Sequence, residues 1–162
     1  MTERKWPTPL IDFVLDLDAG GRARVRRGAD AATLFLLPGL ATLLQRLDNA
    51  QLDDALLTAR IAAILGKNGS AHPAAALARA ELDPRRMGRL LTSEPEVLPE
   101  RLMTVARFLA AKRETASVAP FHWLMAEIRT GAATRNRAEW ARKFAEELAP
   151  PVKATHDKGD KT

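Results

Sequence analysis

The chain contains no cysteine and no tyrosine, and aromatic residues make up only 5% of its 162 residues. Without cysteine it can form no disulfide, no thiolate metal site and no cysteine nucleophile. It has no apolar run of the roughly eighteen residues that a membrane helix needs, and its first residues lack the apolar segment of a signal peptide. We therefore expect a cytoplasmic protein without a membrane partner.

The sequence also lacks the motifs of common catalytic and metal sites. Residues 16–27 begin like a calcium-binding loop, but Arg27 stands where the chelating glutamate is needed. Gly66-Lys67 lacks the upstream glycine and the following Ser/Thr of a phosphate-binding loop. The three histidines are far apart in the sequence, which favours isolated surface or loop residues over metal ligands. We expect no enzymatic activity, no metal and no cofactor.

Apolar residues recur at helical spacing along most of the chain, and no segment alternates as a strand would. The sequence therefore predicts an all-α protein of about eight helices that pack into one compact domain over residues 1–150. This domain is either undivided or split into sub-bundles at 1–82 and 83–150. Residues 151–162 are polar and charged, so we expect a disordered tail there.

Polar residues directly before the periodic segments are the expected helix N-caps. They are Thr8, Asp30, Asn49, Asp83, Ser117 and Asn136. Gly20-Gly21 is expected to end the first helix. Core faces are expected to include Leu52, Leu56, Ala59, Ala63 and Leu148. Trp123 lies opposite the core face of its helix. It is expected to pack on a neighbouring helix, with contact to a partner as the alternative.

Positive charge is distributed unevenly along the chain, whose formal net charge is +5. Residues 1–84 carry ten Lys/Arg and ten Asp/Glu, whereas residues 85–143 carry twelve and six. This excess of basic residues favours an anionic partner, with nucleic acid preferred over a membrane surface.

Arginines gather in two short segments. The stretch from Gly20 to Gly28 holds four arginines within six residues, and a helix over 22–27 would turn Val25 toward the core. Glycines on both sides are expected to let the backbone approach a nucleic-acid strand closely. A second row, Arg85, Arg86 and Arg89, lies opposite Met87, Leu90 and Leu91. Guanidinium groups fit phosphate, although a solvated helix face is the alternative interpretation.

The candidate nucleic-acid-binding residues combine both rows with basic residues of a loop and of the last helix. They are Arg22, Arg24, Arg26, Arg27, Lys67, Arg85, Arg86, Arg89, Arg142 and Lys143.

The order of these segments resembles the CasB family, the small subunit of the type I-E CRISPR surveillance complex called Cascade. The resemblance covers roughly residues 6–148 and is carried by LDAGGRARVRR at 17–27, DPRRMGRLL at 83–91 and WARKF at 140–144. Two departures are the absence of a glycine at 75–79 and the few aromatic residues in the helix around Phe121 and Trp123.

The resemblance implies an all-helical subunit without enzymatic activity that serves antiviral defence. Two copies would lie along the belly of the complex, against other Cascade subunits. They would help to hold the heteroduplex of guide RNA and target DNA, and the displaced non-target DNA strand. The family's arginine pairs match Arg26-Arg27 and Arg85-Arg86. Two alternatives remain open: a free-standing, non-specific DNA-binding protein, and a helical scaffold that binds an acidic protein.

Overall fold

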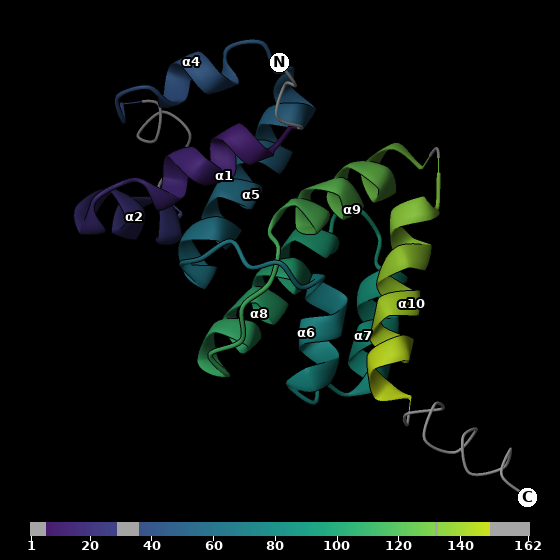
Figure 1. Ribbon diagram of the computed structural model, residues 1–162. Coiled ribbons are helices and arrows are strands. Elements are labelled where there is room, and N and C mark those ends of the chain that lie inside the picture. Colours follow the sequence, from purple (N-terminus) through teal and green to yellow (C-terminus); the bar gives the residue numbers. More distant parts are fainter. Residues whose placement is uncertain (1–5, 29–35, 132, 150–162) are drawn as a thin grey trace, which may run out of the picture.

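The computed structural model describes residues 6–28, 36–131 and 133–149, and these residues form nine α-helices and no strand (Figure 1). The all-α prediction is therefore confirmed. The expected cap Asp30 and the expected tail at 151–162 lie outside the described residues.

The longest helix, α5 (Asn49–Leu65), lies between two groups of helices. The first group consists of α1 (Thr8–Leu15), α2 (Ala19–Arg26) and α4 (Leu40–Leu44); α1 and α2 pack on α5, and α4 packs on α1. The second group consists of α6 (Pro73–Arg79), α7 (Pro84–Leu91), α8 (Leu98–Ala111), α9 (Ala119–Thr130) and α10 (Arg135–Leu148). It meets α5 through α8 and α9, and α6 packs mainly along α10. The division into sub-bundles at 1–82 and 83–150 stays a prediction. In its packing, α6 belongs with the helices that follow it, because it contacts α10 and α8.

The core follows the predicted faces in most helices. Val25, the apolar side of α7 and that of α8 are buried, and Phe121 meets Trp140 edge-on with ring centroids 5.3 Å apart. In α5 the predicted face lies only partly in the core: Ala59 and Ala63 are buried, whereas Leu52 and Leu56 are half-buried. Helices approach α5 from several sides, and its small residues, such as Ala59 and Ala62, are buried between them.

Leu148 was also expected in the core, but its side chain is 48% exposed. It is the last residue of α10, and the buried face of this helix ends at Phe144. An apolar residue in a final turn that no neighbour covers stays in contact with solvent.

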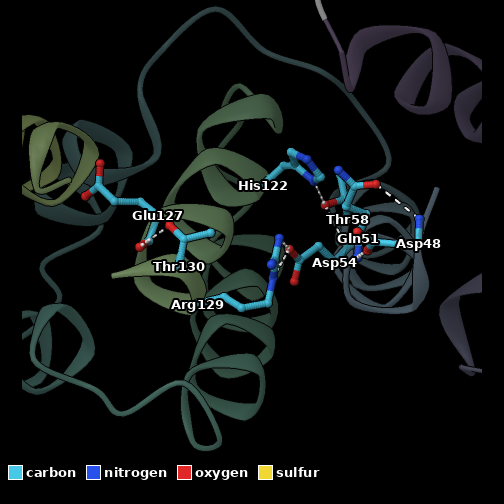
Figure 2. Close-up of polar contacts among 8 residues, drawn as sticks. All are labelled: Asp48, Gln51, Asp54, Thr58, His122, Glu127, Arg129 and Thr130. Carbon is cyan, nitrogen blue, oxygen red and sulfur yellow. Dashed lines mark hydrogen bonds and ion pairs between the residues drawn. The ribbon is translucent and has the colours of Figure 1, made fainter. Parts of the chain in front are cut away.

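Two expected caps lie one residue away from the actual ones. The N-cap of α5 is Asp48, whose Oδ1 accepts the N–H of Gln51 at 2.8 Å while Gln51 Oε1 accepts the N–H of Asp48 at 3.1 Å (Figure 2). This reciprocal pair satisfies two helix-end donors, which Asn49 could not do. The N-cap of α1 is Pro7, and Thr8 is the first residue of the helix. No side chain caps this helix start.

Two other helix starts use acceptors from distant parts of the chain. The N–H of Val118, the N-cap of α9, bonds Oδ1 of Asn68 at 3.0 Å, so Ser117 is not the cap. At α10 the backbone N–H of Asn136 donates to Glu127 of α9 at 2.7 Å. Asn136 therefore does not cap α10, because an acidic side chain from the preceding helix satisfies its first turn.

Candidate nucleic-acid interface

Gly20-Gly21 opens α2 and does not end the first helix, contrary to expectation. Asp18 is the N-cap, and its Oδ1 accepts the N–H of Gly21 at 2.7 Å. Gly21 is buried, and a Cβ there would lie 3.2 Å from both Asp18 Oδ1 and Leu17 Cβ. The aspartate cap thus overrides the helix-breaking tendency of the glycines, and Gly21 serves the fit of this cap.

The C-terminal end of α2 is held by a residue that the sequence did not single out. Arg60 of α5 donates from Nε to the carbonyl oxygen of Arg26 at 3.1 Å. Gly28 has a φ of +72°, and a Cβ there would lie 2.5 Å from Arg60 Cζ. Gly21 is buried and does not offer its backbone to a nucleic-acid strand, whereas Gly20 and Gly28 are exposed at the two ends of α2, with Arg60 beside Gly28.

The arginines of α2 face outward as predicted. Val25, on the opposite side of the helix, is buried with an exposure of 1%. Arg24, Arg26 and Arg27 are exposed, and Arg22 is half-buried. Within the described residues none of these four guanidinium groups has a carboxylate partner. Arg24 and Arg27 line an open cleft of about 640 Å³ whose other residues include Asp16 and Asp18. The outer face of α2 is therefore basic, with Asp16 and Asp18 at its N-terminal edge.

The second row forms on α7 as predicted. Asp83 is the N-cap, with its Oδ1 accepting the N–H of Arg85 at 2.8 Å. Arg85 and Arg89 are exposed on the side opposite the buried Met87. The guanidinium of Arg86 lies over the ring of Phe108 of α8, 5.6 Å from its centroid. In the described part of the chain these arginines, too, have no carboxylate partner.

The remaining candidates differ from these two rows. Arg142 pairs with Glu146 at 2.9 Å and with Glu139, and the bond to Glu139 raises the pKa of Arg142. Its charge is therefore offset within α10. Lys143 is half-buried, and Lys67 is exposed in the loop after α5. The rows do not form one surface patch: α2 packs on α1 and α5, whereas α7 packs on α8 and α10 (Figure 1).

A buried polar network joins α9 to α5 (Figure 2). Arg129 Nε donates to Oδ2 of Asp54 at 2.8 Å, and its Nη2 forms an ion pair with the same oxygen at 2.7 Å. His122 Nδ1 lies 3.0 Å from Thr58 Oγ1. His122 is 8% exposed, so the expectation of a surface or loop residue was wrong for it. Burial lowers the pKa of His122, with the nearby Asp54 opposing this effect.

A pocket of about 390 Å³ lies beside this network, lined mainly by apolar residues of α5, α8 and α9 with Asp53, Asp54 and Arg129. Neither the pocket nor the network contains a group of metal-ligating residues; across the described ranges no cluster of three or more such residues occurs. The network satisfies buried polar atoms and fixes the two helices to each other.

The fold and its surface define a class: an all-helical protein with two separate rows of exposed arginines. The chain matches no protein-family model, and no curated protein or solved structure shows significant similarity to it. Among the helices of the described residues, none combines the length and apolar character that would allow it to cross a membrane.

Proposed function

We propose that this protein is a non-catalytic small subunit of a type I-E CRISPR Cascade complex and acts in the cytoplasm. Its basic residues would stabilise the heteroduplex of guide RNA and target DNA, and the displaced non-target strand. The observation that carries the nucleic-acid part is the exposure of the α2 and α7 arginines without carboxylate partners in the described residues. The assignment to Cascade rests on the resemblance of segments 17–27, 83–91 and 140–144 to the CasB family.

The surface fits contact with phosphates better than contact with bases. Every aromatic side chain in the described residues is buried or half-buried, so little ring surface is offered to an unstacked base. Exposed guanidinium groups release counterions from a phosphate backbone whatever its sequence. Because exchange of a DNA duplex for an RNA–DNA heteroduplex is nearly balanced in free energy, a few such contacts are enough to favour the opened state.

The family resemblance also implies two copies in one complex, for which Trp123 was a candidate contact. Its indole is half-buried, and Nε1 donates to the carbonyl oxygen of Trp6 at 3.2 Å. This supports intramolecular packing of Trp123. A native mass of the assembled complex that fits a single copy would contradict the pairing.

The test is retention of a target duplex by the complex reconstituted with guide RNA and the other subunits, across a salt series. Replacing Arg26 and Arg27, or Arg85 and Arg86, by alanine should weaken binding and lower the salt slope by about one unit per lost contact. The matched control is Arg142→Ala, which should have a smaller effect because Glu139 and Glu146 already offset this charge.

The outcome also separates the alternatives. A chain that binds DNA tightly without partners would support the free-standing DNA-binding protein. Unchanged affinity and salt slope in both double variants would contradict the phosphate contacts and favour the alternative of a helical scaffold that binds an acidic protein. We expect the larger loss from Arg26 and Arg27, because the exposed glycines Gly20 and Gly28 flank them and let a strand approach the backbone closely.

A further inference from the structure

A small basic pocket lies between α7 and α8 and has a volume of about 140 Å³. None of the residues that line it is acidic, and half of them are arginines: Arg86, Arg89, Leu90, Arg101, Thr104 and Val105. Three guanidinium groups around one small hollow repel one another and have no counter-charge from its walls. An anion would remove this repulsion.

Arg101 is held in place by neutral acceptors. Its Nη1 donates to the carbonyl oxygen of Arg89 at 2.9 Å and to Ser93 Oγ at 2.8 Å. Ser93, which is 6% exposed, itself donates to the same Arg89 carbonyl at 2.8 Å. These bonds use both hydrogens of Nη1, while Nη2 and Nε make no bond within the described residues. They also offset the partial negative charge at the C-terminal end of α7.

Arg86 is held on the other side by an aromatic ring. Its guanidinium lies 5.6 Å from the centroid of Phe108, and Lys112 Nζ lies at the same distance from that centroid. The half-buried ring therefore orients two cations and is not open as a platform for base stacking. Two arginines with restricted side chains lose little entropy on binding, which favours a defined site over diffuse attraction.

We propose that this pocket binds a phosphate group, and specifically a backbone phosphate of a nucleic-acid strand, through Arg86, Arg89 and Arg101. The choice of a nucleic-acid phosphate rests on the proposed function. Arg101 is the residue that sequence reasoning did not assign, and Ser93 is its positioning residue. Planar guanidinium forks fit the geometry of phosphate oxygens, which a lysine ammonium cannot reproduce.

The test is binding of a fluorescently labelled, mixed-sequence single-stranded DNA by the full-length protein, measured by anisotropy across a salt series that starts at low salt. Arg101→Gln should weaken binding at least about fivefold and lower the salt slope by about one unit. Arg107→Gln is the matched control, because Arg107 is an exposed arginine of the same helix that does not line the pocket.

Two substitutions that leave the net charge unchanged test whether the pocket has a defined geometry. Arg101→Lys keeps the charge, and Ser93→Ala removes only the hydroxyl that positions Arg101; each should weaken binding about threefold. Circular dichroism spectra and melting temperatures should match those of the unchanged protein. Equal losses from Arg101→Gln and Arg107→Gln, with none from Arg101→Lys and Ser93→Ala, would overturn the site and leave only diffuse attraction.

Two further measurements are needed. The first identifies the source of the phosphate, and the second distinguishes failure of the pocket from failure of the proposed function. Inorganic phosphate that competes as well as unlabelled DNA, at equal phosphate concentration, would overturn a nucleic-acid phosphate in favour of a free anion. The Arg26→Ala, Arg27→Ala variant reports DNA binding by the other arginine row. If this double variant loses DNA binding while Arg101→Gln binds normally, the pocket is overturned and the proposed function stands. If the unchanged protein binds no DNA at low salt, the pocket is also overturned. The proposed function is then tested separately, by retention of the target duplex by the complex.

Discussion

Two glycines of this chain share a backbone conformation but differ in their surroundings. Gly28 and Gly66 both have φ of +72° and both end helices, yet only Gly28 meets a side chain, the guanidinium of Arg60. A side chain in this left-handed region costs about 1 kcal/mol wherever it stands. At Gly28 a Cβ would also displace Arg60 and break its bond to the Arg26 carbonyl.

We therefore predict that Gly66→Ala lowers the free energy of unfolding by about 1 kcal/mol and Gly28→Ala by about 2 kcal/mol. Urea unfolding measures both. In an Arg60→Ala background the two glycine substitutions should cost the same, because the additional contact is then absent. Equal costs in the unchanged protein would show that the Arg60 bond contributes nothing to stability.

At the scale of elements, the start of α10 depends on a side chain from α9. Glu127 is 6% exposed and accepts the N–H groups of Asn136 and Arg137 at 2.7 and 2.8 Å. Thr134, the residue in the N-cap position, makes no side-chain cap bond. We predict that Glu127→Ala costs about 2 kcal/mol of stability in thermal or urea unfolding, because two partly buried backbone donors lose their acceptor.

Thr134→Ala is the control for this substitution and should change stability by less than about 0.5 kcal/mol. A loss from Thr134→Ala as large as that from Glu127→Ala would contradict the assignment of the cap to α9.

A histidine begins α6, and its protonation state is set by that position. His72 Nδ1 accepts the N–H of Ala74 at 3.0 Å, which only the unprotonated nitrogen can do. Burial lowers the pKa of His72 from 6.5 to about 4, and Glu139 opposes this effect. Between these two values the unfolded chain takes up a proton that the folded chain does not. Stability from this group is therefore complete above pH 6.5 and is lost as the pH falls toward 4.

We predict that the melting temperature falls between pH 7 and pH 5 and that His72→Asn makes this fall smaller. Asparagine retains a cap acceptor without titrating in this range. The contribution of His72 is about 1 kcal/mol after allowance for solvent screening of this half-buried ring. His122, whose pKa is also lowered, remains in both proteins and does not affect their difference. Identical pH dependence in both proteins would rule out this role of His72.

These elements also show what a sequence can and cannot predict here. The cap Asp83 was predicted because cap and helix are adjacent in the chain and the interaction is local. Glu127 and Asn68 accept N–H groups at the starts of α10 and α9. They were not predicted, because only tertiary packing brings them to those helix ends.

The same distinction applies to the candidate interface. Helical spacing around Met87 predicts which side of α7 faces outward, and the structure confirms this prediction. Arg60 and Arg101 were not predicted, because their partners lie 34 and 12 residues away in the chain and no local pattern joins them. Among the glycines around α2, Gly21 is buried against Leu17 and Asp18, while Gly20 and Gly28 are exposed as the proposed approach of a strand requires.

At the scale of the whole molecule, α5 is shared by two groups of helices. The first group packs on it through α1 and α2, and the second through α8 and α9 (Figure 1). The two arginine rows belong to different groups, so their relative position depends on the contacts that α5 makes with α8 and α9. The polar part of these contacts is the pair of links from Asp54 to Arg129 and from Thr58 to His122 (Figure 2).

Thr58 offers a direct test of this junction, and Thr104 of α8 is its matched control. Both hydroxyls donate to the carbonyl four residues earlier, at 2.8 Å to Asp54 and 3.0 Å to Glu100. Only Thr58 is buried, and only its oxygen also meets a side chain from another helix, His122 at 3.0 Å. With its hydrogen directed at the Asp54 carbonyl, Thr58 Oγ1 accepts from Nδ1–H of His122.

We predict that Thr58→Val lowers the free energy of unfolding by about 2 kcal/mol, because a buried ring nitrogen of His122 loses its partner. Thr104→Val should change it by less than about 0.5 kcal/mol, since the exposed hydroxyl exchanges its bond with water. Urea unfolding should show a lower midpoint for Thr58→Val. A reduced slope would mean that the two groups of helices no longer unfold as one unit. Equal midpoints for the two variants would show that the bond between Thr58 and His122 does not stabilise the junction of α5 and α9.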